Sequence, residues 1–179
     1  MVGKGSVNPN SRKFKAANVD SERTDRNIDY CSENIKDVCH ELFDGALERY
    51  NAKQIRDDRW IENYYEKIRT GKQEKPFHEL ILQIGDKDNM GATTENGELA
   101  KQVLDEYYQG FQERNPTLRV FSAHLHMDEA TPHLHIDFVP FTTGSKRGLD
   151  TRVSLKQALA ALGFKGGTRG MTEWNQWVQ

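Results

Sequence analysis

The chain has 179 residues, of which 36% are hydrophobic and 29% are charged, and its net charge at pH 7 is −2. This length suits one domain or slightly more, and such a chain can bury a core without disulfides. No stretch approaches the roughly 20 apolar residues that a membrane-spanning helix needs, and the polar N-terminus shows no signal-peptide pattern. Cys31 and Cys39 provide no disulfide framework, so a cytoplasmic protein is expected.

Charge is distributed unevenly along the chain. Residues 1–26 and 140–170 are both basic, whereas the segment between them is acidic. If the fold brings the two basic segments together, they form a rim that attracts phosphate groups. On charge alone, two solvated loops are the simpler interpretation.

The first part of the chain is predicted to be helical after an irregular start. Residues 1–29 are rich in Gly, Asn, Ser and Asp and lack periodicity, so they are expected to be irregular. Ser32 is then the expected N-cap of an amphipathic helix that ends near residue 53. A more polar helix is expected over about 57–70, with Trp60 and Tyr64 on its buried face.

The second part of the chain combines strands and helices. Alternating residues predict a strand over 77–84, and helical spacing predicts a helix over about 99–111. Two β-rich runs follow, 118–127 and 132–140, and then a short helix that Ser154 caps. This order predicts an α+β fold in which helices pack on one face of an antiparallel sheet. The expected core residues of the two runs are Phe121, Leu125, Leu134, Ile136 and Phe138.

Four of the six histidines lie in the two β-rich runs. Side chains alternate between faces along a strand, so His124 and His126 share a face, as do His133 and His135. If the runs pair as a hairpin with His126 opposite His133, all four imidazoles cluster on one surface. Such a cluster has the chemistry of a divalent metal site on the central hairpin.

The turn between the two runs carries two carboxylates, Asp128 and Glu129, which are expected to orient imidazole N–H groups. The alternative is that the histidines are ordinary surface residues. Four neighbouring imidazoles without a metal would repel one another when protonated, and this favours the metal site.

The residues from His126 to His135 read HMDEATPHLH, which resembles the HxDExxPHxH motif of the MobV family of plasmid mobilisation relaxases. This family is also called Mob/Pre, or plasmid recombination proteins, and belongs to the HUH endonucleases in the broad sense. Asn18–Thr24 resembles a second family segment, with Ser21 where proline is usual. By this resemblance, 1–29 carries the nucleophile region, 30–170 is the relaxase catalytic domain, and 171–179 begins a truncated C-terminal helix.

The resemblance implies a metal-dependent DNA strand transferase, a site-specific endonuclease that nicks single-stranded DNA at a plasmid origin of transfer and initiates conjugative mobilisation. Coupling or accessory proteins of conjugation are further implied partners, and the implied metal is Mn²⁺ or Mg²⁺. The implied metal ligands are His126, His133 and His135, and the motif glutamate is Glu129. Two more residues, His124 and Asp128, would support the ligands from outside.

The resemblance also implies that basic residues contact the DNA. Arg12 would act at the catalytic site by clamping the scissile phosphate, although it could equally be an ordinary loop arginine. The residues expected to bind the strand are Arg12, Lys13, Lys15, Lys146, Arg147 and Arg152.

One position departs from the family pattern. The family's H-N-x-R element, whose histidine is the nucleophile, corresponds here to Pro9–Arg12, and proline has no nucleophilic atom. Tyr30 is the nearest tyrosine, and other relaxase families use tyrosine. Two alternatives stay open: a cleavage-deficient relative that binds origin DNA and retains the three-histidine site, and an unrelated metalloenzyme such as a cupin. Long helical segments argue against the many-stranded barrel of a cupin.

Overall fold

The computed structural model describes residues 10–12, 17–167 and 170–179. The chain divides into two compact units. The first comprises the described residues up to Glu33 together with His78–Arg114 and Val120–Phe138. The second comprises Asn34–Phe77, Asn115–Arg119 and Val139–Gln179. The domain boundaries expected after residues 29 and 170 stay a prediction.

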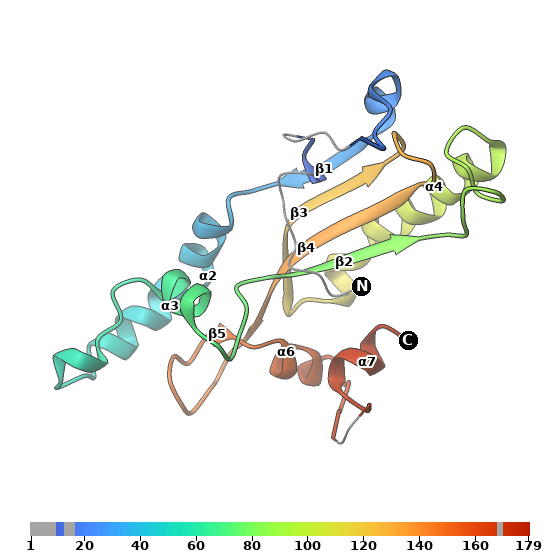
Figure 1. The fold of residues 1–179 in the computed structure, drawn as a ribbon. Coiled ribbons are helices and arrows are strands. Elements are labelled where there is room, and N and C mark those ends of the chain that lie inside the picture. The colour runs from blue at the N-terminus through green and yellow to red at the C-terminus, as the bar shows by residue number, and fades with distance from the viewer. Residues whose placement is uncertain (1–9, 13–16, 168–169) are drawn as a thin grey trace. The chain divides into compact units, whose positions relative to one another are not determined.

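A sheet with strand order β1-β3-β4-β2 forms the centre of the first unit (Figure 1). The strands are β1 (Ile28–Ser32), β2 (His78–Gln83), β3 (Leu118–His126) and β4 (His133–Thr142). β1 pairs antiparallel with β3 and places Asp29 opposite His124. β2 pairs antiparallel with β4 and places Glu79 opposite Asp137. The predicted α+β class with an antiparallel sheet is confirmed.

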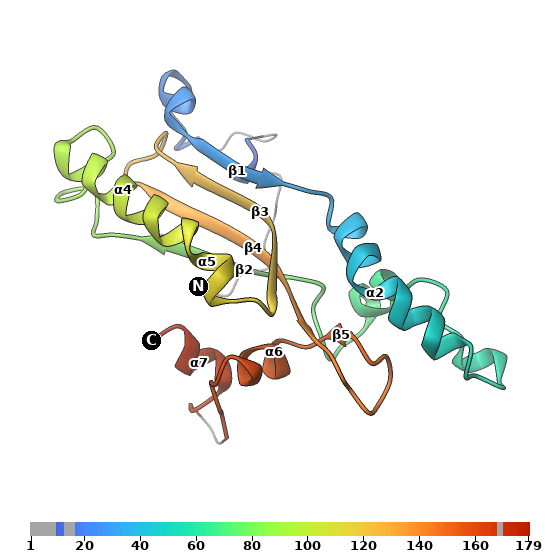
Figure 2. The ribbon, with the colours of Figure 1, turned by 180° about the vertical axis from the view of Figure 1, so that it is seen from behind.

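Alternation along β3 and β4 gives the sheet one apolar and one polar face. Helix α4 (Glu95–Gln109) covers the apolar face, as the two opposite views show (Figures 1 and 2). The short helix α5 (Phe111–Arg114) adds Phe111, whose ring lies 6.4 Å from that of Phe138. The expected core is confirmed, since five side chains are at most 1% exposed: Phe121, Leu125, Leu134, Ile136 and Phe138.

The prediction for the segment before the first long helix was wrong. A 3₁₀ helix, η1 (Ser21–Arg26), and strand β1 form where irregular chain was expected. Asn34, not Ser32, caps α2 (Ile35–Asn51) by accepting a hydrogen bond from the Lys36 N–H. Strand β1 lacks strong apolar alternation, and its hydrogen bonds go to β3, which is distant in sequence, so the local pattern gave no sign of it.

The helix predicted over 57–70 is interrupted. A 3₁₀ turn, η2 (Asp57–Arg59), is followed by α3 (Tyr64–Thr70), which Asn63 caps. Trp60 precedes this cap and is 61% exposed, so its expected place on a buried helix face was wrong. Tyr64 is buried as predicted.

The second unit also contains β5 (Arg152–Val153), α6 (Leu155–Ala161) and α7 (Glu173–Trp177). Ser154 caps α6 as predicted, since its side chain accepts a hydrogen bond from the Gln157 N–H. Helix α7 falls within the segment where a further helix was expected. Among the described residues, no helix combines the length and apolarity needed to span a membrane.

Two leucines of α4 offer a matched test of how the helix packs. Leu104 is 3% exposed, whereas Leu99 is 53% exposed. We expect Leu104→Ala to lower the free energy of unfolding by about 2–5 kcal/mol because it leaves a cavity under the helix. Leu99→Ala should change it by less than about 0.5 kcal/mol. Urea unfolding of both variants checks this, and equal losses would contradict the packing described.

Candidate metal centre

Three imidazoles meet on the polar face of the sheet. One ring nitrogen from each of His126, His133 and His135 lies within 4.8 Å of the other two. The ring centroids are 5.0 to 5.1 Å apart. His126 is the last residue of β3, and the other two alternate at the start of β4. Among the described residues, this is the group whose side chains could together hold a metal ion.

Each imidazole donates one N–H to an oxygen outside the cluster. The acceptors are the Asn10 carbonyl for His126 Nε2 (2.8 Å), the Thr131 carbonyl for His133 Nδ1 (2.9 Å) and Glu79 Oε1 for His135 Nδ1 (2.7 Å). Because an ionised carboxylate or a carbonyl can only accept, the hydrogen-bond network assigns a proton to each of these nitrogens. The second nitrogen of each ring then carries a lone pair, and His126 Nδ1 lies 3.3 Å from His133 Nε2. The rings are thus oriented as metal ligands are.

The protonation states suit metal binding. Burial lowers the pKa of His126 to about 3, and the nearby positive charge of Arg12 acts in the same direction. Burial also lowers the pKa of His133 below its ordinary value. Both rings are therefore neutral at pH 7, which is the form that binds a metal ion.

Glu79 supports the cluster although the sequence analysis did not select it. Its carboxylate is 7% exposed and accepts hydrogen bonds from His135 and from the Asn10 side-chain amide, the latter at 2.8 Å. Burial alone would raise the pKa of Glu79, but these two hydrogen bonds lower it overall, so the carboxylate is ionised. Asn10 therefore supports two ligands, His126 through its carbonyl and His135 through Glu79.

A second buried carboxylate lies beside Glu79. Asp137 is opposite Glu79 in the β2–β4 pair and is fully buried. Burial, reinforced by the negative charge of Glu79, raises the pKa of Asp137 to about 6. Only the pairing of β2 with β4 brings these carboxylates together, so their spacing along the sequence gives no sign of it.

The turn after β3 holds the N-terminal segment. Asp128 is fully buried and accepts hydrogen bonds from Arg12 Nε (2.9 Å), Thr24 Oγ1 (3.2 Å) and Asn27 Nδ2 (2.7 Å). Burial would raise the pKa of Asp128, but the hydrogen bonds from Arg12 and Asn27 lower it overall. In the structure, Asp128 thus anchors the N-terminal segment, while the imidazoles use other acceptors.

Arg12 and Glu129 lie beside the imidazoles. Arg12 forms ion pairs with Asp128 and with Glu129, the latter at 3.0 Å. Glu129 also accepts a hydrogen bond from Asn18 at 2.6 Å, and its Oε1 lies 3.7 Å from His133 Nε2. An open hollow on this face is lined by Arg12 and Glu129 together with His133 and His135. A ligand that enters the hollow meets a guanidinium, a carboxylate and two imidazoles.

His124 lies outside the three-imidazole group. Its Nδ1 lies 2.6 Å from Asp29 Oδ1, and its ring centroid is 6.3 Å from that of His126. The expectation that all four imidazoles cluster is therefore wrong for His124. Its partner belongs to β1, a strand that the sequence pattern did not predict.

The other predicted site residues are distributed as follows. Pro9, Lys13 and Lys15 lie outside the described residues. Lys146, Arg147 and Arg152 belong to the second unit, where all three line one shallow hollow.

Tyr30 is directed toward the helix-covered face of the sheet. Its hydroxyl donates a hydrogen bond to Asp105 of α4 at 2.6 Å, and its ring stacks on Tyr108 at 4.0 Å. Burial, followed by the hydrogen bond to Asp105, raises the pKa of Tyr30. Tyr30 therefore does not reach the imidazoles on the opposite face.

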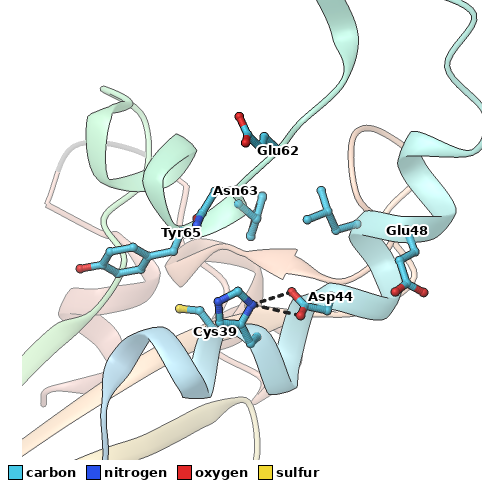
Figure 3. Close-up of a pocket in the computed structure, with 9 residues that line it drawn as sticks. Cys39, Asp44, Glu48, Glu62, Asn63 and Tyr65 are labelled. Atoms are coloured by element: carbon cyan, nitrogen blue, oxygen red, sulfur yellow. Dashed lines mark hydrogen bonds and ion pairs between the residues drawn. The ribbon is translucent and has the colours of Figure 1, made fainter. Parts of the chain in front are cut away.

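Another histidine lies beside a pocket of the second unit. Asp44, Glu48 and Glu62 surround this pocket, which adjoins α2 and the residues before α3 (Figure 3). His40 Nδ1 lies 3.1 and 3.0 Å from the two carboxylate oxygens of Asp44. This exposed pair on one helix is separate from the three-imidazole group.

The fold is similar to a solved structure of the MobM relaxase domain (MOBV; Mob_Pre), a manganese-bound crystal structure in complex with a 22-nucleotide oriT DNA of plasmid pMV158. The TM-score is 0.50 with 20% sequence identity, and the match covers 88% of this chain and 73% of that chain. At this identity the likeness concerns the fold, which is that of a relaxase domain.

Residues 9–163 match the Mob_Pre family, described as plasmid recombination enzymes, and the chain belongs to this family. Plasmid recombination enzyme type 2 of Staphylococcus aureus, from strains Mu50 and N315, is 28% identical to it over 141 residues. The match covers 76% of this chain and 33% of each relative. The chain therefore spans about a third of the length of these relatives.

The anchoring role of Asp128 can be tested by proteolysis. Asp128→Asn leaves Arg12 without its buried ionic partner, a loss that typically costs about 3 kcal/mol. We expect trypsin to cleave after Arg23 and Arg26 at least about tenfold faster, because cleavage follows local opening of the segment. Asp25→Asn removes the same charge from an exposed side chain and should leave the rate unchanged. Equal rates in the two variants would contradict the anchor.

Proposed function

We propose that this chain is a relaxase domain that binds a divalent metal ion on His126, His133 and His135 and nicks single-stranded DNA at a plasmid origin of transfer. The observation that carries the proposal is the inward orientation of three imidazoles, each fixed by its outer N–H. Membership of the plasmid recombination enzymes supports the DNA substrate. The manganese-bound, oriT-bound MobM domain, whose fold is similar, agrees with it.

The donor set fits a divalent ion. Three imidazoles whose ring nitrogens lie within 4.8 Å of one another are nitrogen ligands, and Mg²⁺ prefers oxygen, so we favour Mn²⁺ over Mg²⁺. When bound, such an ion supplies Lewis-acid polarisation of a phosphate oxygen. Glu79, Thr131 and Asn10 fix the ring orientations from outside, which raises the affinity of the ligands.

The residues around the hollow would bind and orient the scissile phosphate. Arg12 provides a planar guanidinium that suits bidentate phosphate binding. Its charge is now compensated by Asp128 and Glu129, so a phosphate would replace a carboxylate at the guanidinium. Glu129, next to His133, is placed to accept a proton near the reacting phosphate. We expect Lys13, Lys15 and the basic residues of 146–152 to hold the strand through its phosphates.

Whether this chain has a nucleophile distinguishes a nicking relaxase from a relative that only binds origin DNA. Pro9 stands where the family places histidine, and Tyr30 points to the opposite face of the sheet. This favours, as a second candidate, a relative that binds origin DNA and a metal but forms no covalent adduct. Both candidates share the metal site and act in the cytoplasm, with accessory proteins of conjugation as partners.

Calorimetric titration with Mn²⁺ tests the metal site without knowledge of the DNA sequence. We expect one ion to bind per chain, and binding to be lost in the double variant His133→Ala, His135→Ala. Glu79→Gln should weaken binding by about 10- to 100-fold, the usual effect of removing a partner that orients a ligand.

Matched controls are available in the second unit. His40→Ala and Glu62→Gln change the same residue types at exposed positions and should leave the affinity unchanged. Failure of the parent chain to bind Mn²⁺ would remove the basis of the proposal.

Restoring the family nucleophile separates the two candidates. The chain and its Pro9→His variant are incubated with Mn²⁺ and single-stranded DNA that carries a cognate origin. If only Pro9 blocks cleavage, the variant forms a protein–DNA adduct that survives SDS, whereas the parent forms none. An adduct in the parent would show that another residue attacks. No adduct in either form would leave DNA binding as the function of this domain.

A further inference from the structure

A pocket in the second unit has the chemistry of a nucleotide site. It is bounded by the end of α2, by the 61–74 segment that contains α3, and by residues 147–153. Its floor is apolar and nearly inaccessible, and is formed by Ile61, Tyr64, Leu149 and Val153, which are between 2% and 8% exposed. We call this the α3 pocket.

Hydrogen bonds connect the elements that form the walls of the α3 pocket. The Tyr64 hydroxyl accepts from the Val153 N–H at 3.1 Å, which joins α3 to β5. The Asn51 side chain donates to the Ile61 carbonyl at 2.8 Å and accepts from the Ile61 N–H at 3.0 Å, which joins α2 to the 61–74 segment. Because all walls are tied, the pocket is preformed, as ligand sites commonly are.

The rim of the α3 pocket is positively charged. The residues that line the pocket include one acidic side chain, Glu74, and four cationic side chains: Lys67, Lys72, Arg147 and Arg152. Within 10–12, 17–167 and 170–179, none of the four forms an ion pair. Arg152 Nε is oriented by a hydrogen bond to Ser145 Oγ at 3.1 Å. The rim therefore attracts an anion to the edge of an apolar floor.

We infer that the α3 pocket binds one nucleotide of a single DNA strand, with the base against the floor and the neighbouring phosphates at the rim. A purely apolar ligand would make no use of the four cationic side chains, and a phosphate ion alone would make no apolar contact with the floor. Two tyrosines, Tyr50 and Tyr64, line the pocket, and aromatic side chains bind bases without regard to sequence. This inference rests on the proposed DNA-binding function and concerns residues outside the metal centre.

The first test compares two labelled 20-mers by fluorescence anisotropy: oligothymidine, and an abasic strand with the same phosphates. The parent should bind oligothymidine about tenfold more tightly, the order of magnitude of base–aromatic contacts. Ile68→Trp places a larger side chain in the pocket and should reduce this preference to less than about threefold, with affinity for the abasic strand unchanged. Ile55→Trp, the same change at a position that is 99% exposed, should keep the preference.

The rim is tested with a matched pair of charge changes. Arg147→Gln should weaken binding of both strands and reduce the slope of log affinity against log salt by about 0.7, the value for one phosphate contact to a single strand. Arg59→Gln, at an exposed position outside the pocket, should leave the slope unchanged. Thymidine monophosphate serves as a competitor. If it displaces the strand at micromolar concentration, the ligand is a free nucleotide and the strand assignment is overturned.

The outcomes separate the pocket from the proposed function. Equal affinity of the parent for both strands, or a preference that Ile68→Trp does not reduce, overturns the pocket and leaves DNA binding intact. Failure of the parent to bind either strand overturns the pocket, whereas the proposed function is judged separately by the Mn²⁺ titration and by the adduct assay on origin DNA. A second measurement needs no variant: 5-iodouracil in the strand should photo-crosslink to the peptides that contain Tyr50 or Tyr64. Crosslinks confined to other peptides overturn the inference.

Discussion

The two-residue period of β3 and β4 is the constraint on which the first unit depends. One set of alternate residues, such as Leu125, Leu134 and Ile136, is fully buried on the apolar side of the sheet. The other set presents His126, His133 and His135 together. A slip of one residue in the pairing would exchange the two sets and place imidazoles under α4. Because burial of the apolar set fixes the register, the hydrophobic core also determines the geometry of the three-imidazole group.

The strands supply the ligands, but other parts of the chain fix their orientation. β2 contributes Glu79 to His135, and the N-terminal segment contributes the Asn10 carbonyl to His126. The same segment is held by Asp128, which lies between the ligands of the motif. The chemistry of such a site therefore involves more than its three histidines, since a ring that can rotate presents its lone pair poorly.

The strength of the sequence signals explains which features could be predicted. The apolar alternation of 118–140 is strong, and it predicted both strands, the core side chains and a shared face for the imidazoles, although it also placed His124 in the cluster. Strand β1 and Glu79 could not be found in this way, because their roles come from pairing with strands far away in the sequence. The helix predicted over 57–70 was too long. Its spacing is helical, but Asn63 caps α3 and begins the helix only after Trp60.

His124 shows the limit of reasoning from period alone. It shares a face with His126, yet it pairs with Asp29 on the other neighbouring strand. Strand periodicity gives the face on which a side chain lies, whereas the identity of its partner depends on the order of strands in the sheet.

The contacts of Asn10 have a thermodynamic consequence. This residue is 5% exposed; its carbonyl accepts a hydrogen bond from His126, and its side-chain amide donates one to Glu79, which in turn holds His135. The docking of the N-terminal segment and the binding of the proposed ion would therefore depend on each other. If docking of the segment raises the affinity for the ion by some factor, the bound ion raises the equilibrium constant for docking by the same factor. Under the proposed function, the ion would therefore also hold Asn10 and Arg12 in the positions that the structure shows.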